Sequence, residues 1–197
     1  MYDKTRFEKA LAVFDQYNAK DPNQEDVKGL LVPKELAYAQ RMTDRLLKFF
    51  PGASGYLQLA ARGQHIGRWE IARSQYPMDK KGYFQWRNKL KEHHAAIVEP
   101  ILKDSGFDDR EIEKVKSLIL KKELAVNPET QTLEDVICLV FLEYYCEEFA
   151  ARHKDEKVID ILRKTIKKMS TTAIHAVAEI HLTDKIKSMI YEASGKR

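Results

Sequence analysis

Two histidines and one aspartate stand where a helical pattern turns their side chains inward. His65 lies in the segment 64–69, His94 lies on an apolar stripe that includes Leu90, and Asp135 opens a run that is otherwise apolar. A neutral imidazole suits proton transfer or metal ligation near pH 7, and an aspartate is seldom buried unless it is paired or bound to a cation. We therefore predict His65, His94 and Asp135 as catalytic residues, with His65 and Asp135 as ligands if a divalent metal ion binds.

Each of these residues also has an ordinary structural interpretation. His65 taken alone is typical of a histidine at the edge of a core that bonds a backbone carbonyl. Asp135 close to a helix start would be favoured by the helix dipole, with Thr132 as the N-cap. His93 and Glu134 are expected to face away from the inward group, because adjacent helical residues diverge by about 100°.

Arginines and aromatic residues alternate between residues 62 and 87. A guanidinium group presents a planar fork that suits phosphate or carboxylate, and an aromatic ring can stack on a base. The predicted anion-binding residues are Arg62, Arg68, Arg73 and Arg87. The predicted stacking residues are Trp69, Tyr76 and Trp86. The alternative is structural, because arginine lying on tryptophan is a common contact inside folded proteins.

Helices are expected to position all of these residues, because apolar residues recur at helical spacing along most of the chain. The expected helices cover residues 4–18, 33–50, 54–65, 79–103, 112 to about 127, 133–149, 158–165 and 171–192. Residues 68–77 are expected to form a loop or a broken helix, and Pro100 is expected to kink or divide the helix that contains it. The segment 133–149 is apolar on nearly every face, which predicts a helix at the centre of the domain.

Composition also favours a helical protein. The chain has 197 residues, of which 44% are hydrophobic and 32% are charged, so it is expected to fold rather than remain disordered. Its 8 glycines and 6 prolines are too few for a sheet of many short strands and turns. We predict an all-α fold, with residues 1–197 forming a single domain built as a bundle of about eight helices.

Charge and cysteine content favour a protein of a reducing compartment. The formal charge of +4 permits an anionic ligand, but no block of like charges demands nucleic acid. Cys138 and Cys146 lack zinc-type spacing and are expected to be ordinary thiols. No apolar run is long enough to span a membrane, and the N-terminus has no signal-peptide core. We therefore predict a cytoplasmic protein with no membrane partner.

Several strings of the sequence resemble the family called domain of unknown function 4202. The resemblance runs from about residue 7 to residue 170, so the expected C-terminal helix at 171–192 lies beyond it. The strings that carry it include PKELAYA at 33–39, LAAR at 59–62, QHI at 64–66, LEDV at 133–136 and CLVFL at 138–142. Ala72 and Ile166 depart from it, since the family usually has proline and tryptophan there. The family carries no established activity, so this resemblance implies no reaction.

The order of the helices is also similar to the HD superfamily of metal-dependent phosphohydrolases. In that superfamily a histidine on one helix precedes a His-Asp pair on the next, and a later central helix carries a final aspartate. The resemblance implies that His65 matches the histidine of the pair, His94 an extra histidine of some members, and Asp135 the final aspartate. Ile66 stands in place of the paired aspartate and Tyr38 in place of the first histidine, so two of the four metal ligands differ.

The two changed positions leave two functions open. Glu35 or Glu70 could substitute as ligands, and the resemblance then implies a phosphohydrolase of an HD-like core that acts on a small phosphorylated or nucleotide substrate. Alternatively, a degenerate HD-like scaffold binds a nucleotide, another small anion or RNA without turnover. A divalent metal ion is the only cofactor that the pattern suggests. A role as a scaffold has only the helical architecture in its favour.

Overall fold

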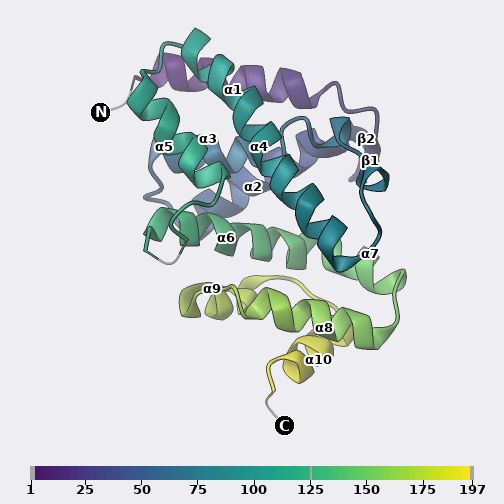
Figure 1. Ribbon diagram of the computed structural model, residues 1–197. Helices are drawn as coiled ribbons and strands as arrows, with labels where there is room; N and C mark the ends of the chain where they lie inside the picture. The colour runs from purple at the N-terminus through teal and green to yellow at the C-terminus, as the bar shows by residue number, and fades with distance from the viewer. Residues whose placement is uncertain (1–2, 125, 196–197) are drawn as a thin grey trace.

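The computed structural model describes residues 3–124 and 126–195, and helices dominate it, with 71% of the residues helical. The elements in chain order are α1 (Lys4–Asn18), β1 (Gln24–Val27), β2 (Leu30–Pro33), α2 (Lys34–Phe49), α3 (Gly55–Gly63), α4 (Lys80–Asp104), α5 (Asp109–Ile119), α6 (Pro128–Val140), α7 (Cys146–Ala151), α8 (Asp155–Ile166), α9 (Thr171–Ala176) and α10 (Asp184–Ala193) (Figure 1). Short 3-10 turns lie at Arg68–Glu70, Arg73–Gln75 and Val177–Glu179, and a π-helical turn lies at Phe141–Tyr145. The all-α prediction is confirmed.

Polar residues placed just before the helices explain where several of them begin. The side chain of Asp3 accepts a hydrogen bond from the amide of Thr5 at 2.9 Å, and that of Ser54 accepts one from the amide of Leu57 at 3.1 Å. Asp108 starts α5 with a reciprocal capping box that includes Glu111. Such side chains satisfy backbone N–H groups that have no partner within the helix. Ser54 is thus the N-cap of α3.

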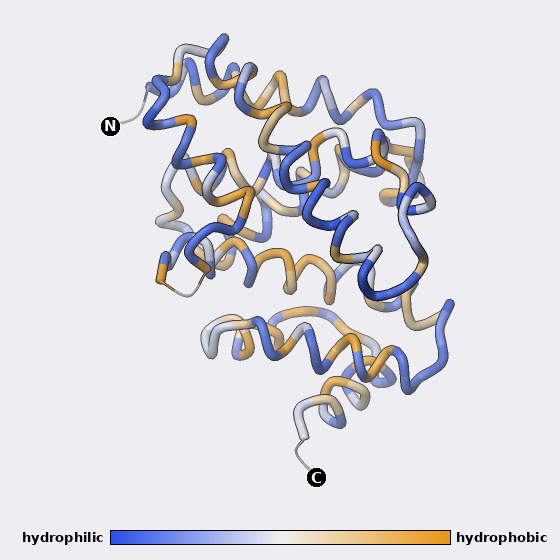
Figure 2. The backbone as a smooth tube through the Cα atoms, in the orientation of Figure 1, coloured by the Kyte–Doolittle hydropathy of each residue, from blue (hydrophilic) through white to orange (hydrophobic). Residues whose placement is uncertain are grey.

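The central helix α6 separates two apolar clusters. Leu133, Val136 and Val140 pack with residues of α1–α5, whereas Cys138 and Leu139 pack with residues of α7–α10. Figure 1 shows α8, α9 and α10 on the side of α6 away from α1–α5, and Figure 2 shows that the C-terminal half of α6 is mostly apolar. A helix covered on both sides needs no polar face. The predicted central position of this segment is therefore confirmed.

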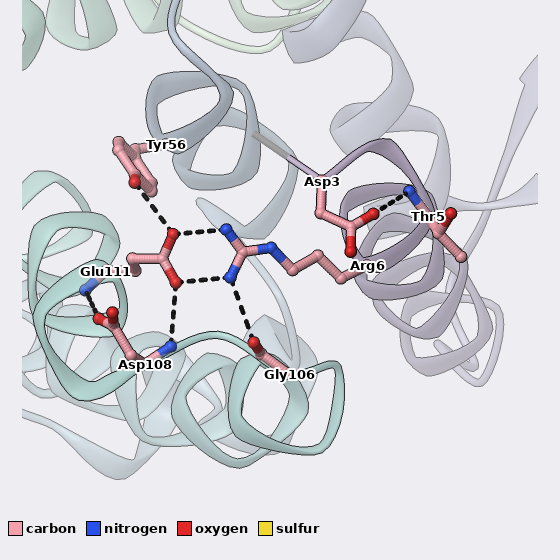
Figure 3. A network of polar contacts seen from close by, with 7 residues as sticks. All are labelled: Asp3, Thr5, Arg6, Tyr56, Gly106, Asp108 and Glu111. Atoms are coloured by element: carbon pink, nitrogen blue, oxygen red, sulfur yellow. Dashed lines mark hydrogen bonds and ion pairs between the residues drawn. The ribbon is translucent and has the colours of Figure 1, made fainter. Parts of the chain in front are cut away.

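A network around one carboxylate joins α1, α3 and α5 at the edge of the first cluster (Figure 3). Arg6 donates hydrogen bonds to both carboxylate oxygens of Glu111, at 2.7 and 2.6 Å, and to the carbonyl of Gly106 at 3.2 Å. The hydroxyl of Tyr56 and the amide of Asp108 donate to the same carboxylate, at 3.1 and 3.0 Å. The hydrogen bond from Arg6 is the chief reason that the pKa of Glu111 is lowered.

A small hairpin that the sequence analysis did not predict precedes α2. Strands β1 and β2 pair antiparallel, with Gln24 opposite Pro33 at the open end. The turn places Lys28 and Gly29 at φ 56° and 85°, and the carboxylate of Asp26 accepts a hydrogen bond from the amide of Gly29 at 2.9 Å. Strands of four residues are too short for a clear alternating pattern. The hairpin matters here because it forms one wall of a pocket beside α2.

Three of the predicted helices differ from the observed ones in whether they are continuous or divided. Helix α4 runs through Pro100 without ending there, so the predicted division of that helix is wrong. The segment 133–149 is interrupted by the π-helical turn, and the segment 171–192 is divided into α9 and α10 by residues 177–183. Because of these two divisions, the α-helices of the described residues are numbered up to α10, whereas the sequence predicts eight. Within the residues that the structure describes, no helix is both long enough and apolar enough to cross a bilayer.

Candidate functional site

His65 is carried by a tight turn rather than by a helix. Helix α3 ends at Gly63, and the amide of Arg68 donates a hydrogen bond to the carbonyl of His65 at 3.0 Å. Gly67 has φ 67°, and a Cβ atom at this position would lie 2.5 Å from Cδ1 of Ile97. Glycine is favoured by both the left-handed conformation and the lack of space. The expected helix over 54–65 thus ends early, and the turn brings the His65 ring against α2.

Two residues of α2 contact the imidazole of His65. The ring of Tyr38 stacks on it, with centroids 3.9 Å apart and planes inclined by 10°. Oε2 of Glu35 lies 3.3 Å from Nδ1 of His65, although the two groups are not aligned for a hydrogen bond. Tyr38 is the residue that the HD resemblance placed at the position of the first histidine. Glu35 is one of the two residues named as possible substitute metal ligands. Neither is among the predicted site residues.

Arg68 completes the contacts of the His65 ring. Its NH1 group lies 3.2 Å from Nε2 of His65, and its Nε lies 3.6 Å from Oε1 of Glu35. Because a guanidinium only donates, Nε2 of His65 is the acceptor and the ring proton is assigned to Nδ1. The guanidinium lies 4.8 Å above the ring of Trp86, whose indole N–H donates to the carbonyl of Ile71 at 2.9 Å. Trp86 is therefore a fixed platform for Arg68.

His94 lies beside this group, as the sequence predicts. Its ring centroid is 5.9 Å from that of His65, and its Nδ1 lies 2.6 Å from the carbonyl oxygen of Ile66. A carbonyl oxygen accepts hydrogen bonds, so Nδ1 carries the ring proton and Nε2 keeps a free lone pair. The structure therefore brings the two predicted catalytic histidines together, with His94 held by the same turn that presents His65.

Arg87 interacts electrostatically with the residues around His65. Arg87 donates a hydrogen bond to the hydroxyl of Tyr83 at 3.3 Å, and its charge acts on both His65 and Tyr38. Tyr38 is only 7% exposed, and its hydroxyl has no hydrogen-bond partner among the described residues. A buried polar atom without a partner in a native fold calls for an explanation, such as an unseen water or ligand. The residues that form what we name the His65 site are Glu35, Tyr38, His65, Arg68, Arg87 and His94.

Burial sets the protonation states in the His65 site. It raises the pKa of Glu35 to about 7, an effect that Arg68 partly offsets. Burial, followed by the positive charge of Arg68, lowers the pKa of His65 well below its usual value of 6.5. Burial also lowers the pKa of His94 to about 3, despite its hydrogen bond to the backbone. At pH 7 both histidines are therefore neutral, while Glu35 is near the midpoint of its titration.

Glu134 is buried and contacts lysines rather than the residues of the His65 site. It forms an ion pair with Lys121 and lies 3.6 Å from Nζ of Lys168. Its charge acts on Arg87, and that of Lys121 acts on His65. Lys121 also has φ 56°, a backbone conformation that costs energy for a residue other than glycine. This pair is not predictable from the sequence, because Lys121 follows the end of α5 whereas Glu134 lies in the middle of α6.

Asp135 is not brought to the two histidines. Its carboxylate accepts hydrogen bonds from the amide and the hydroxyl of Ser170, at 2.8 and 2.6 Å, and from Gln131 at 3.0 Å. The hydroxyl of Ser170 in turn accepts a hydrogen bond from the amide of Ala173 and so caps α9. Helix α6 begins at Pro128, so Thr132 is not its N-cap either. Asp135 therefore fastens α9 to α6 rather than facing a reactive group.

The remaining predicted residues are divided between structural contacts and the surface. Arg62 pairs with Asp15 at 2.7 and 2.6 Å, and Arg73 donates hydrogen bonds to backbone carbonyls that follow it. Trp69 lies 6.0 Å from the ring of Tyr17, centroid to centroid. Tyr76 is partly exposed in the loop before α4. Of the four predicted anion-binding arginines, the structure places only Arg68 and Arg87 at the His65 site.

Side chains that could ligate a metal ion do not cluster within residues 3–124 and 126–195. No three His, Cys, Asp or Glu side chains in these ranges come together in a way that could hold a metal ion. Glu70, the other possible substitute, contacts His93 at 3.0 Å and accepts a hydrogen bond from Tyr17 at 2.7 Å. A divalent metal ion as a cofactor therefore stays a prediction from the sequence, and the structure does not bring together the two ligands, His65 and Asp135, that the sequence predicts for it.

Comparison with known proteins gives one match. A family model described as a domain of unknown function (DUF4202) matches residues 8–190. No curated protein and no solved structure matches the chain. The family match covers the His65 site and nearly all of both core clusters, and it extends through most of α10, beyond the residue at which the resemblance in the sequence ended. The likeness to an HD core stays a prediction.

Proposed function

We propose that this chain, which belongs to the family described as a domain of unknown function (DUF4202), binds a small phosphorylated anion at the His65 site. The observation that carries the proposal is the buried hydroxyl of Tyr38, which has no hydrogen-bond partner among the described residues and on which the positive charges of Arg68 and Arg87 act. A hydroxyl donor and two guanidinium groups in one site are a suitable set of donors for a phosphate group.

The position of Arg68 supports binding of an anion rather than a purely structural role. Its guanidinium is held by the Trp86 ring and by the contact with Nε2 of His65, so little side-chain freedom remains to be lost on binding. Its side chain is nevertheless 28% exposed, and that of His65 is 21% exposed. The site is thus ordered before a ligand arrives, yet solvent reaches it.

The balance of charge also favours an anion. Arg68 and Arg87 are cations, the two histidines are neutral at pH 7, and Lys121 is neutralised by Glu134. The remaining negative charge is that of Glu35, which is about half protonated at this pH. The residues of the His65 site therefore carry an excess of positive charge. Because the site is largely buried, this charge would strongly stabilise a bound anion.

Titration with inorganic phosphate tests the proposal. We expect phosphate to raise the melting temperature of the wild-type protein, since a ligand that binds only the folded state stabilises it. Arg68→Gln and Arg87→Gln should each weaken phosphate binding about tenfold, the loss expected for a charge-assisted hydrogen bond. Arg163→Gln on α8 is the matched control, because Arg163 is exposed and far along the chain from the site.

Two results would contradict the proposal. The first is a wild-type protein that phosphate does not stabilise at any concentration that leaves a control protein unaffected. The second is equal weakening of phosphate binding in Arg87→Gln and Arg163→Gln, because binding would then depend on overall charge and not on the His65 site. Calorimetric titration of the same three variants gives the affinities directly.

Hydrolysis of a phosphate ester is the second candidate function, and the contact between Glu35 and His65 favours it. A carboxylate close to the protonated nitrogen of a neutral imidazole would stabilise the imidazolium that forms if Nε2, released from its contact with Arg68, took a proton. Incubation with p-nitrophenyl phosphate, comparing wild type with His65→Asn, separates turnover from binding. Binding of RNA has less support, because Arg62 and Arg73 are already engaged within the fold.

A further inference from the structure

A pocket of about 320 Å³ lies between the hairpin, the start of α2 and the helical segment that follows α6. It is lined by Gln24, Glu25, Asp26, Lys34, Arg41, Tyr144, Tyr145 and Glu148. This volume is at the lower end of the range of small-molecule sites. None of these residues is among the predicted site residues, and none belongs to the His65 site.

The π-helical turn supplies the aromatic wall of the pocket. It spans Phe141–Tyr145, and its last two residues, Tyr144 and Tyr145, both line the pocket. Turns of this kind are rare and often occur at functional sites. The guanidinium of Arg41 lies 4.5 Å from the centre of the Tyr144 ring, while the Tyr144 side chain remains 42% exposed. A cation can cover only one face of a ring, so the exposed part is available for stacking.

The polar wall of the pocket is rich in acceptors. Glu25 forms an ion pair with Arg41, which also donates a hydrogen bond to the hydroxyl of Tyr145 at 2.9 Å. Asp26 and Glu148 add two further carboxylates to the lining. Carboxylates beside a planar ring suit a ligand part that carries hydroxyl or amino donors together with an aromatic ring.

The pocket adjoins the His65 site through a pair of tyrosines. The ring of Tyr145 lies 6.0 Å from that of Tyr38, centroid to centroid. Tyr38 and Arg41 are three residues apart on α2, so they lie on the same face of that helix. The charge of Glu35 acts on Tyr145, and that of Glu25 acts on Glu35. The pocket and the His65 site are therefore neighbours, on either side of the contact between the rings of Tyr38 and Tyr145.

We infer that this pocket receives the nucleoside part of a nucleoside monophosphate whose phosphate lies at the His65 site. The inference rests on the proposed function and adds the class of ligand to it. The base would stack on the exposed part of Tyr144, and the ribose hydroxyls would donate hydrogen bonds to the carboxylates of the lining. The arginine pair of the His65 site would hold the phosphate, and Arg41 would lie between the two parts.

Affinities of the folded protein for inorganic phosphate and for adenosine 5′-monophosphate test this inference. We expect the nucleotide to bind the wild-type protein about tenfold more tightly than phosphate does, which is the gain expected for one stacked base. Tyr144→Leu should bring the affinity for the nucleotide down to that for phosphate and leave phosphate binding unchanged. Tyr191→Leu on α10 is the matched control, since Tyr191 is also an exposed tyrosine.

The outcomes separate this inference from the proposed function. If phosphate binds and Arg68→Gln weakens it, but the nucleotide binds no more tightly than phosphate, the inference is overturned and the proposed function stands. The same holds if Tyr144→Leu binds the nucleotide as well as Tyr191→Leu does. If neither phosphate nor the nucleotide binds the wild-type protein, both fail together. Melting curves without ligand verify that each variant is folded.

Discussion

Replacing Glu35 with glutamine is expected to stabilise the protein at pH 8 by up to about 3 kcal/mol and to leave its stability below pH 4.5 nearly unchanged. The pKa of Glu35 is raised from 4.5 to about 7 by burial. At about 1.4 kcal/mol per pKa unit, this difference corresponds to the stated energy. Glutamine keeps the shape of the side chain and cannot ionise.

The direction of the pH dependence follows from the two protonation states. A carboxyl group whose pKa is higher in the folded chain holds its proton more tightly there than in the unfolded chain. Its contribution to stability is therefore complete below pH 4.5 and is lost as the pH rises toward 7. Wild type should lose this contribution between pH 4.5 and pH 8, and Glu35→Gln should not.

Chemical denaturation at several pH values measures the effect. Glu111→Gln is an informative control, because the pKa of Glu111 is lowered and its contribution is present above pH 4.5 and lost only on acidification. The two variants should therefore shift the pH dependence in opposite directions. Equal slopes for wild type and Glu35→Gln between pH 5 and 8 would contradict the assignment of the raised pKa to Glu35.

The same carboxylate should control the binding of anions. Ionisation of Glu35 adds a negative charge beside Arg68, so binding should weaken as the pH rises from 6 to 8. Sulfate is the suitable probe, since its own charge does not change over this range. We expect sulfate affinity to depend on pH in wild type and to be nearly independent of pH in Glu35→Gln. His65 and His94 are already neutral throughout and add nothing to this dependence.

Replacing Asp135 with alanine is expected to lower the free energy of unfolding by about 3 kcal/mol. The change removes three hydrogen bonds to a buried carboxylate and leaves the amide and hydroxyl of Ser170 without this acceptor. In a chain of this length the melting temperature should fall by roughly 10 °C. Because Asp135 fastens α9 to α6, the loss should appear first in the protection of α9 against hydrogen exchange.

Phosphate binding distinguishes this structural role from a role in the site. We expect Asp135→Ala to bind phosphate with wild-type affinity at temperatures where it remains folded. Asp44→Ala is the matched control, because Asp44 is exposed on α2 and its loss should leave stability nearly unchanged. A folded Asp135→Ala protein that no longer binds phosphate would contradict the structural assignment and support the predicted catalytic role.

The sequence predicts most of the helices because their apolar faces repeat with a strong period. It also predicts the central place of α6, since a segment with no polar face must be covered on every side. It does not predict the breaks at Phe141–Tyr145 and at residues 177–183, because apolar residues continue through both segments. The hairpin is likewise hidden, since strands of four residues carry too little pattern.

Helical spacing finds His65 and His94 but says little about their partners. Tyr38 and Glu35 reach His65 because α2 packs beside the turn after α3, and such packing leaves no local signal in the sequence. Asp135 is inward, as the pattern indicates, yet it faces Ser170 on the opposite side of α6 from the first core. Inward position is a local property, whereas the partner of an inward group is set by the tertiary fold.

The most direct test of the central claim is the position of a bound anion. Crystals soaked in tungstate, which resembles phosphate and scatters anomalously, would locate it without assuming which residues bind it. We expect a peak within hydrogen-bond distance of the Tyr38 hydroxyl and the Arg68 guanidinium, and loss of this peak in crystals of Arg68→Gln. A peak elsewhere on the chain with none at the His65 site would contradict the claim.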